Sequence, residues 1–295
     1  MNTIQYLVRY YIQNIIMILT LTKIELHKIF SKWRSYIGFI AIGILTPIVQ
    51  LVLYLEGQNS LNFYTQSISQ SFVMVGNLFN GYLIANIILQ ALYINLPFLI
   101  VLVGGDLLAG EATSGTYRML ITRPITRFQL ITSKFISGVI YTNLLLFWLM
   151  FLSLFVSMMI FGTGELIVLR DKIYIFASDD VMWRFIYAYG FATLSMTTVF
   201  ALSFLFSSLV ENAIGPIVAS MAVIIIFLIF SALRFEFFEQ LRPFFFTSHM
   251  SEWRGFFTDP INYSEIINSG LILMGHIVGL YFITLFLFKR KDILS

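Results

Sequence analysis

A short charged stretch between two long apolar runs holds the residues of this chain that are best suited to contact a partner protein. Gly110 and Gly115 allow tight backbone turns there, and Glu111 lies between them. Pro124 sets the direction of the chain before the next apolar run begins. Carboxylate and guanidinium groups form charge-assisted hydrogen bonds, with one another or with a soluble protein. The chemistry expected here is recognition by charge, and the basic residues available for it are Arg118, Arg123, Arg127 and Lys134.

Known catalytic and metal-binding patterns are missing from the sequence. The chain has no cysteine, which excludes a thiol nucleophile and a cysteine metal site. His27, His249 and His276 lie in different segments, without the spacing of a metalloprotease or hydrolase motif. His249 with Glu252 could touch a metal ion, but an ordinary polar contact is the favoured interpretation. Because there is also no phosphate-binding G-x-x-x-x-G-K-[ST] loop, we do not expect this chain to be an enzyme.

Membrane-spanning helices must position these residues, because the composition is far from that of a soluble domain. Hydrophobic residues make up 59% of the chain, charged residues 11%, and the mean hydropathy is +0.87. Soluble domains carry about 25% charged residues. Six continuously apolar runs approach the roughly 20 residues that a membrane-spanning helix needs, and alternation typical of a β-barrel is missing. We therefore expect an all-α integral membrane protein with spans at 36–55, 84–104, 134–161, 184–208, 214–233 and 267–288, the third longer than a bilayer requires.

The distribution of charge predicts the orientation. Twelve of the 18 Lys and Arg residues precede the first run, follow the second run or follow the sixth, whereas ten of the 15 Asp and Glu residues fall on the opposite side. Because loops rich in Lys and Arg stay in the cytoplasm, both termini are expected to be cytoplasmic in a multi-pass protein of the cell membrane. Few charges lie within the runs. This argues against a proton- or ion-coupled carrier, which needs titratable groups inside the membrane.

The segments that flank the spans have their own patterns. Residues 20–35 combine apolar residues at helical spacing with basic ones, which predicts a helix lying in the membrane interface before the first span. A plain extension of the first span is the alternative. The outer stretches 56–83, 162–183 and 234–266 are too short for a domain and too aromatic for linkers, so short surface helices are expected. Residues 1–295 are expected to form a single transmembrane domain.

Four features resemble the permease subunits of type-2 ABC transporters, an exporter-like class. The likeness covers nearly the whole chain. Residues Lys23-Ile24-Glu25-Leu26-His27-Lys28 are similar to the connecting, or elbow, helix of that family. The family's segment G-E-x-x-x-G-T-x-x-x-L-x-x-R-P-x-x-R is matched by Gly110-Glu111, Gly115-Thr116, Leu120, Arg123-Pro124 and Arg127. The six-span plan with a cytoplasmic amino terminus and the basic ending Phe288 to Ile293 are similar as well.

The resemblance implies that residues 105–130 form a cytoplasmic coupling loop, which docks on separate ABC ATPase subunits and transmits their motion to the spans. ATP and Mg would be bound by those partners, with no cofactor bound directly to this chain. A second permease subunit, identical or related, would complete an exporter in the lipid bilayer, and nucleic acid is not an expected partner. The expected coupling residues are Asp106, Gly110, Glu111, Gly115, Thr116, Arg118, Arg123, Pro124 and Arg127, and the expected elbow residues are Lys23, Glu25, Lys28, Lys32 and Trp33.

Three alternatives stay open. The loop could be a capped helical hairpin whose charges only set the membrane topology. The chain could be a membrane scaffold or mechanical transmitter that binds an ATPase but moves nothing across the bilayer. It could also be an ATP-independent channel or carrier.

Overall fold

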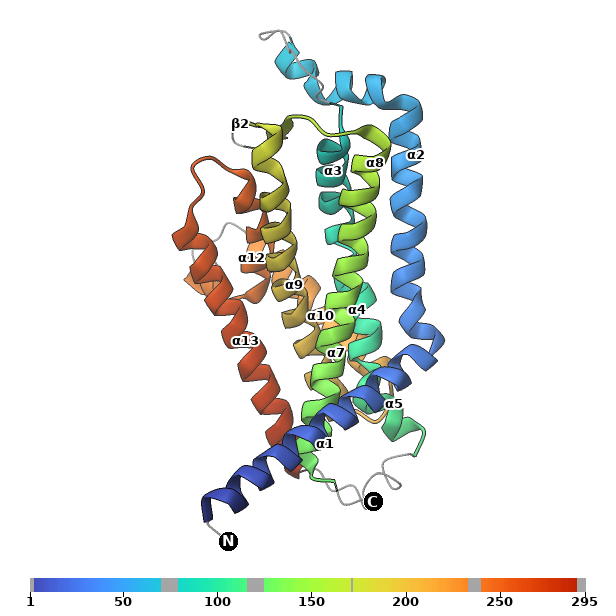
Figure 1. Ribbon diagram of the computed structural model, residues 1–295, viewed down its shortest axis with the longest axis vertical. Coiled ribbons are helices and arrows are strands. Elements are labelled where there is room, and N and C mark those ends of the chain that lie inside the picture. The colour runs from blue at the N-terminus through green and yellow to red at the C-terminus, as the bar shows by residue number, and fades with distance from the viewer. Residues whose placement is uncertain (1–2, 70–78, 116–124, 171, 233–239, 291–295) are drawn as a thin grey trace.

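The computed structural model describes residues 3–69, 79–115, 125–170, 172–232 and 240–290, except for the side chains of residues 3–11, 58–69 and 232. Long helices run side by side along one axis of the molecule (Figure 1). We call the end at the bottom of Figure 1, where α13 ends, the lower end. In chain order, the elements are α1 (Thr3–Ser31), α2 (Trp33–Ser69), α3 (Gly81–Tyr93), α4 (Leu96–Gly104), α5 (Asp106–Thr113), α7 (Arg127–Met150), the π-helix η1 (Phe151–Val156), α8 (Ser157–Phe161), β1 (Leu166–Leu169), β2 (Ile173–Phe176), α9 (Ser178–Leu209), α10 (Ile214–Ala232), the 3-10 helix η2 (Arg242–Phe244), α12 (Phe246–His249), the 3-10 helix η3 (Met250–Phe257) and α13 (Tyr263–Arg290).

Six helical segments of the described chain are long and apolar enough to cross a membrane, which confirms the all-α integral membrane fold. Five of them coincide closely with the predicted first, third, fourth, fifth and sixth spans. The remaining one, at the second span, is displaced relative to the prediction. The six segments are Trp33–Gly57, Leu96–Thr113, Arg127–Phe161, Ser178–Leu209, Ile214–Ser231 and Tyr263–Arg290.

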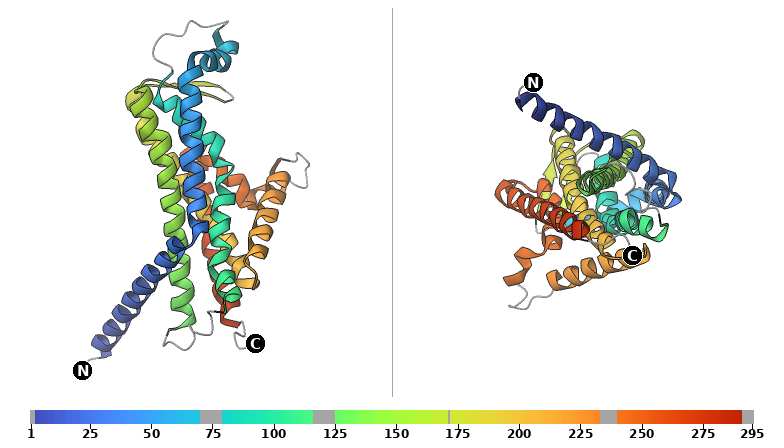
Figure 2. Two further views of the ribbon diagram at one scale, coloured as in Figure 1. Left: turned by 90° about the vertical axis from the view of Figure 1, so that its right-hand side faces the viewer. Right: turned by 90° about the horizontal axis from the view of Figure 1, so that it is seen from below.

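Helix α9 is at the centre of the bundle. It contacts α4, α5, α7, α10 and α13. Of the residues in its most apolar stretch, 72% are buried inside the protein. The view from below shows α7, α10 and α13 arranged around it (Figure 2). In α10 only 17% of the residues in the most apolar stretch are buried. Most of its side chains therefore face outward, as expected of a helix in contact with lipid.

The second predicted span, 84–104, is wrong as a single helix: it falls on two short helices, α3 and α4, and a third, α5, follows it. Pro97, in the first turn of α4, has no backbone N–H to donate to the preceding turn, and the hydrogen-bond ladder of α3 stops there. Between α4 and α5 the ladder is completed by Ser207 of α9. Its Oγ accepts hydrogen bonds from the N–H groups of Leu108 and Ala109 (3.0 and 2.9 Å) and donates one to the carbonyl of Gly105 (2.6 Å).

The third span is confirmed to be longer than a bilayer requires. Helices α7, η1 and α8 form one continuous element of 35 residues, which corresponds to about 52 Å against roughly 30 Å of hydrocarbon. Its π-helical part, η1, has wider turns than an α-helix, so that some backbone carbonyls are freed from their α-helical hydrogen bonds. The side chain of Gln50 from α2 donates to the carbonyl of Leu152 (2.8 Å) and to Ser157 Oγ (2.9 Å) there, which joins the first span to the third.

At the upper end, the outer stretches are confirmed in part. Helix α2 bends at Glu56, whose φ and ψ are −118° and 17°, and its last part crosses the top of the bundle (Figure 1). The third stretch holds the short helices η2, α12 and η3, as expected. The second stretch is a correction, because β1 and β2 pair as an antiparallel hairpin, with Leu166 opposite Phe176. Its β-branched and aromatic residues favour paired strands over a helix.

The elbow helix extends beyond its predicted limits. Helix α1 covers Thr3–Ser31 rather than 20–35 and diverges from the bundle toward its amino terminus (Figure 2). It ends because the hydroxyl of Ser35 donates to the carbonyl of Ile29 (2.6 Å), which satisfies a terminal acceptor and turns the chain into α2. Trp33 therefore belongs to α2. Several apolar side chains of α1 face outward, as in a helix that contacts lipid; they are Ile12, Ile15, Ile16 and Leu19.

Candidate functional site

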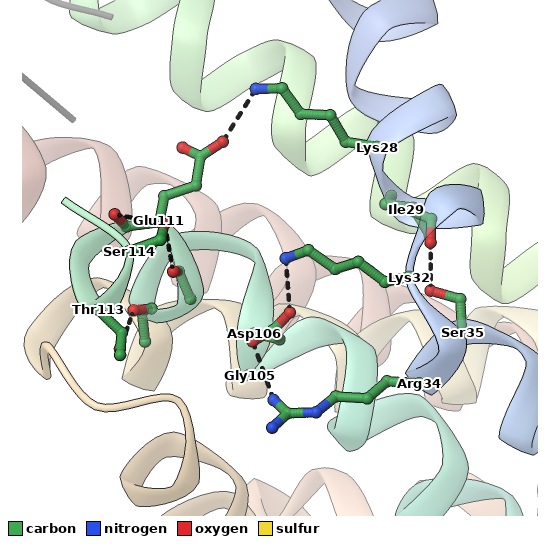
Figure 3. A network of polar contacts seen from close by, with 12 residues as sticks. Lys28, Ile29, Lys32, Arg34, Ser35, Gly105, Asp106, Glu111, Thr113 and Ser114 are labelled. Atoms are coloured by element: carbon green, nitrogen blue, oxygen red, sulfur yellow. Dashed lines mark hydrogen bonds and ion pairs between the residues drawn. The ribbon is translucent and has the colours of Figure 1, made fainter. Parts of the chain in front are cut away.

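The helical part of the predicted coupling segment, α5, faces α1 at the lower end of the bundle. Its first residue is Asp106, which reaches Lys32 and Arg34 at the bend between α1 and α2 (Figure 3). Glu111 follows five positions later and reaches Lys28 of α1. Gly110 makes room for the Asp106 carboxylate. A Cβ at position 110 would lie 2.4 Å from Asp106 Oδ1, so a larger residue would displace this carboxylate.

Four charged side chains from three helices form what we call the charge cluster: Glu25 and Lys28 of α1, Glu111 of α5 and Lys134 of α7. Lys134 Nζ lies 2.7 Å from Glu25 Oε2 and 2.8 Å from Glu111 Oε1. Lys28 Nζ lies 2.7 Å from Glu25 Oε1 and 3.0 Å from Glu111 Oε1. Each ammonium group thus bridges the same two carboxylates, and two positive charges balance two negative ones.

Burial makes this balance important. The exposed fractions of the side chains are 1% for Lys134, 4% for Glu25, 10% for Glu111 and 39% for Lys28. Burial alone would lower the pKa of Lys28, but its contacts with Glu25 and Glu111 outweigh this effect, and the pKa lies above its ordinary value of 10.5. Lys28 is therefore charged at neutral pH. Removing one member of a buried charged group costs about 3–5 kcal/mol, because a charge is left without compensation.

A second set of ion pairs joins α5 to the bend between α1 and α2. Lys32 Nζ lies 2.7 Å from Asp106 Oδ2, and an Arg34 guanidinium nitrogen lies 3.1 Å from Asp106 Oδ1 (Figure 3). Both cations are about half exposed, whereas the Asp106 side chain is 11% exposed. Asp106 thus fixes the start of α5 to the bend, and Glu111 fixes its end to α1 and α7.

Helix α5 is also attached on its other side, to α9 and the loop that follows it. Ser207 holds its first turn, as described above. At its last residue, the hydroxyl of Thr113 lies 2.6 Å from the carbonyl oxygen of Glu211, in the short loop between α9 and α10. Gly115 follows with φ of +67°, a conformation that favours glycine, and the chain leaves α5 there. Helix α5 therefore contacts α1, α7 and the α9–α10 hairpin at once.

The structure brings the two predicted sets of site residues together. Asp106, Gly110 and Glu111 of the coupling set meet Glu25, Lys28 and Lys32 of the elbow set, as described above. Lys23 and Trp33 are exposed, the latter at 73%, and take no part in these contacts. Thr116, Arg118, Arg123 and Pro124 lie outside the described residues. A role of any of these residues in coupling to an ATPase stays a prediction.

Arg127 has a local partner. Its guanidinium donates to the carbonyls of Phe288 and Lys289 (3.0 and 2.8 Å), which are near the carboxyl end of α13. A cation at this position is favourable, because the last carbonyls of a helix have no partner within the helix and carry partial negative charge. Arg127 thus joins the start of α7 to the end of α13.

Two residues important to this site, Arg34 and Ser207, were not predicted. Lys134 was expected as a basic residue available to a partner protein, whereas the structure buries it between two carboxylates; its position at the start of the third predicted run was the signal for this. Arg34 is a basic residue at the edge of the first predicted run. Ser207 had no such signal, because serine within a membrane helix usually bonds to its own backbone. Its position opposite the break between α4 and α5 is visible only in the structure.

The sequence predicted few charges within the spans and none available inside the membrane for ion coupling, but the structure buries several there. Asp106, Glu111 and Lys134 are buried within the spanning segments. Arg184, also buried, bonds to Asp180 (2.7 Å) near the upper end of α9. These groups lie near the ends of their helices: Lys134 is the eighth residue of its span, about 10 Å from the start. All of them are paired. At the lower end the pairs connect different helices, whereas Arg184 and Asp180 pair within α9, and Arg184 reaches another segment by donating to the carbonyls of Phe256 and Thr258 (2.8 and 3.1 Å).

His249, the residue considered for a metal contact, makes ordinary polar contacts. One ring nitrogen lies 2.9 Å from Ser269 Oγ and the other 2.9 Å from the carbonyl oxygen of Pro243. Within the part of the chain that the structure describes, no three His, Cys, Asp or Glu side chains form a group that could hold a metal ion.

Two comparisons with known proteins bear on the family of this chain. Over 64 residues the chain is 34% identical to the "Uncharacterized protein YhcI" of Bacillus subtilis (strain 168), which covers 22% of this chain and 20% of that protein. The chain thus matches about a fifth of that relative's length. A family model described as "ABC-2 family transporter protein" matches residues 19–293, which include α5, the charge cluster and all six spanning segments. This multi-pass membrane protein therefore belongs to the ABC-2 family of transporter proteins.

Proposed function

We propose that this chain is the transmembrane permease subunit of an ATP-driven exporter, coupled to separate cytoplasmic ABC ATPase subunits. ATP and Mg would be bound by those subunits, and no cofactor would be bound directly to this chain. A second permease subunit, identical or related, would complete the transporter in the cell membrane. Membership of the ABC-2 family supports the permease role. The clustering of basic residues near the lower end supports an orientation with this end and both termini in the cytoplasm.

The observation that carries the coupling role is the attachment of α5 on several sides. Its two carboxylates are bound to α1, α7 and the bend before α2, while Thr113 and Ser207 connect it to α9 and the loop before α10. A force applied where the chain leaves α5, at Ser114 and Gly115, would therefore be passed to several spans. A loop held by fewer contacts would bend without moving them.

The cysteine-free chain allows this proposal to be tested by site-specific labelling. A photo-crosslinking group at the exposed Ser114 is expected to capture an ATPase subunit in intact cells. The same group at Met159, which is 81% exposed near the other end of the third span, serves as the matched control. Capture of the ATPase from both positions equally, or from neither, would contradict the coupling role.

A second measurement separates a permease from a scaffold that only binds the ATPase. Single cysteines placed along α9 are labelled with a membrane-impermeant maleimide, with and without ATP and vanadate. For a permease, trapping the ATPase should change which positions are accessible from each side of the membrane, because transport requires alternating access. ATPase capture with an unchanged labelling pattern would support the scaffold instead.

A further inference from the structure

A cavity of about 590 Å³ opens between α1 and the α4–α5 segment at the lower end of the bundle. Pockets of roughly 300–1,000 Å³ hold ligands of drug size, so this cavity can hold a polar headgroup and the beginning of one acyl chain. Its charged lining extends beyond the charge cluster to the half-exposed Lys32 and Arg34. Neither the ion pairs nor the coupling role proposed above explains the open space itself.

The lining is divided into a charged part and an apolar part. The charged part carries four basic side chains against three acidic ones, which leaves an excess of positive charge. The excess of positive charge lies at Lys32 and Arg34, because these two cations share the single carboxylate of Asp106 (Figure 3). An ammonium group has three donors and a guanidinium has five, so one contact each to Asp106 leaves most of their donors available. The apolar part consists of Leu21, Ile24, Ile29, Leu102, Val103, Leu107 and Ile125.

The position of the cavity matches the headgroup layer of a bilayer. It lies at the bend where α1 meets the first spanning segment, which begins at Trp33. Trp33 is 73% exposed beside Lys32 and Arg34, and exposed tryptophans are enriched at the boundary between hydrocarbon and water. Basic pockets between membrane helices bind anionic headgroups, and an apolar wall next to such a pocket suits an acyl chain. A free phosphate ion would satisfy the cations but leave the apolar wall uncovered.

We infer that this cavity binds one anionic phospholipid, with its phosphate at Lys32 and Arg34 and the start of one acyl chain against Ile24, Leu102 and Val103. The lipid would lie between the elbow helix and α5 and contact both. This inference does not depend on the proposed export function, because it follows from the charge, shape and position of the cavity alone.

The experiment measures lipid binding to the purified full-length chain in neutral detergent by native mass spectrometry, with phosphatidylglycerol and phosphatidylcholine as probes. Binding of phosphatidylglycerol is expected to be stronger. Lys32→Gln should weaken it about fivefold, the effect of one lysine near an anionic surface. Lys23→Gln is the matched control, since Lys23 is an exposed lysine of α1 that does not line the cavity. Ile24→Trp fills the apolar part without changing any charge and should also weaken binding.

Four results would overturn the inference. They are equal binding of the two lipids, equal weakening by Lys23→Gln and Lys32→Gln, unchanged phosphatidylglycerol binding by Ile24→Trp, and full displacement of the lipid by inorganic phosphate or glycerol phosphate at concentrations comparable to that of the lipid. The last result would show that the site takes a soluble anion. Circular dichroism and thermal unfolding of each variant confirm that it is folded, and Ile24→Trp provides a test that leaves the ion pairs intact.

Discussion

Substituting Lys134 by methionine tests the charge cluster most directly. The Lys134 side chain is 1% exposed, and its ammonium group is within 2.8 Å of both Glu25 and Glu111. Methionine retains most of the volume and removes the charge, so that two buried carboxylates are left with Lys28 as their shared cation. Breaking a buried ion pair from one side costs about 3–5 kcal/mol of unfolding free energy, and we expect a loss of this size.

The assay is equilibrium unfolding of the purified protein in mixed micelles, where the free energy of unfolding is measured for each variant. Lys23→Met is the control, because this exposed lysine of α1 forms no ion pair with the residues that the structure describes, and its loss should cost less than about 0.5 kcal/mol. The double variant Glu25→Gln with Lys134→Met leaves one carboxylate and one ammonium group in the cluster. It should therefore be more stable than the sum of the two single effects predicts.

Two results would refute the reasoning. If Lys134→Met cost no more than Lys23→Met, the cluster would not contribute to stability in the way that its burial and distances indicate. If the double variant were as unstable as the two single losses added together, Glu25 and Lys134 would act independently, and the cluster would not be a coupled unit.

Three further predictions concern packing, the broken second span and pH. Ser207→Ala should destabilise the protein by about 1–3 kcal/mol in the same unfolding assay, because two buried N–H groups of α5 lose their acceptor; Ser203→Ala, which removes a bond within its own helix, should cost less. Gly81→Ala should lower the free energy of unfolding by about 1–3 kcal/mol, because the added Cβ would lie 2.5 Å from the Cα of Met158 in α8. Gly190→Ala is the control; this glycine has open space around it, so the substitution should be neutral or stabilising. Burial, with a smaller effect of the Glu265 charge, raises the pKa of Glu252 above its ordinary value of 4.5. When Glu252 ionises as the pH rises, its buried charge therefore lowers the stability of the folded state. Glu252→Gln should thus raise the melting temperature at pH 7 and have little effect near pH 4; equal effects at both pH values would contradict this assignment.

The length of the apolar runs was sufficient to predict the number and nature of the spans. A bilayer requires each spanning helix to satisfy its own backbone within a fixed thickness, so a run of suitable length can form little else. The break within the second span could not be predicted in the same way. Pro97 is visible in the sequence, but the hydroxyl that completes the α4–α5 ladder comes from Ser207, about 100 positions further along the chain.

The same division applies to the site. The order of glycines and charges at Gly110, Glu111 and Gly115 indicated a coupling segment, and the pattern of residues 20–35 indicated an elbow helix, each as a local signal. What the sequence alone determined was therefore the membrane class and the candidate segments, because hydrophobicity and turn propensity act over neighbouring residues. Only the tertiary structure decided that Glu25, Glu111 and Lys134 share one buried cluster, because ion pairing depends on distances of a few ångströms between helices that are far apart along the chain.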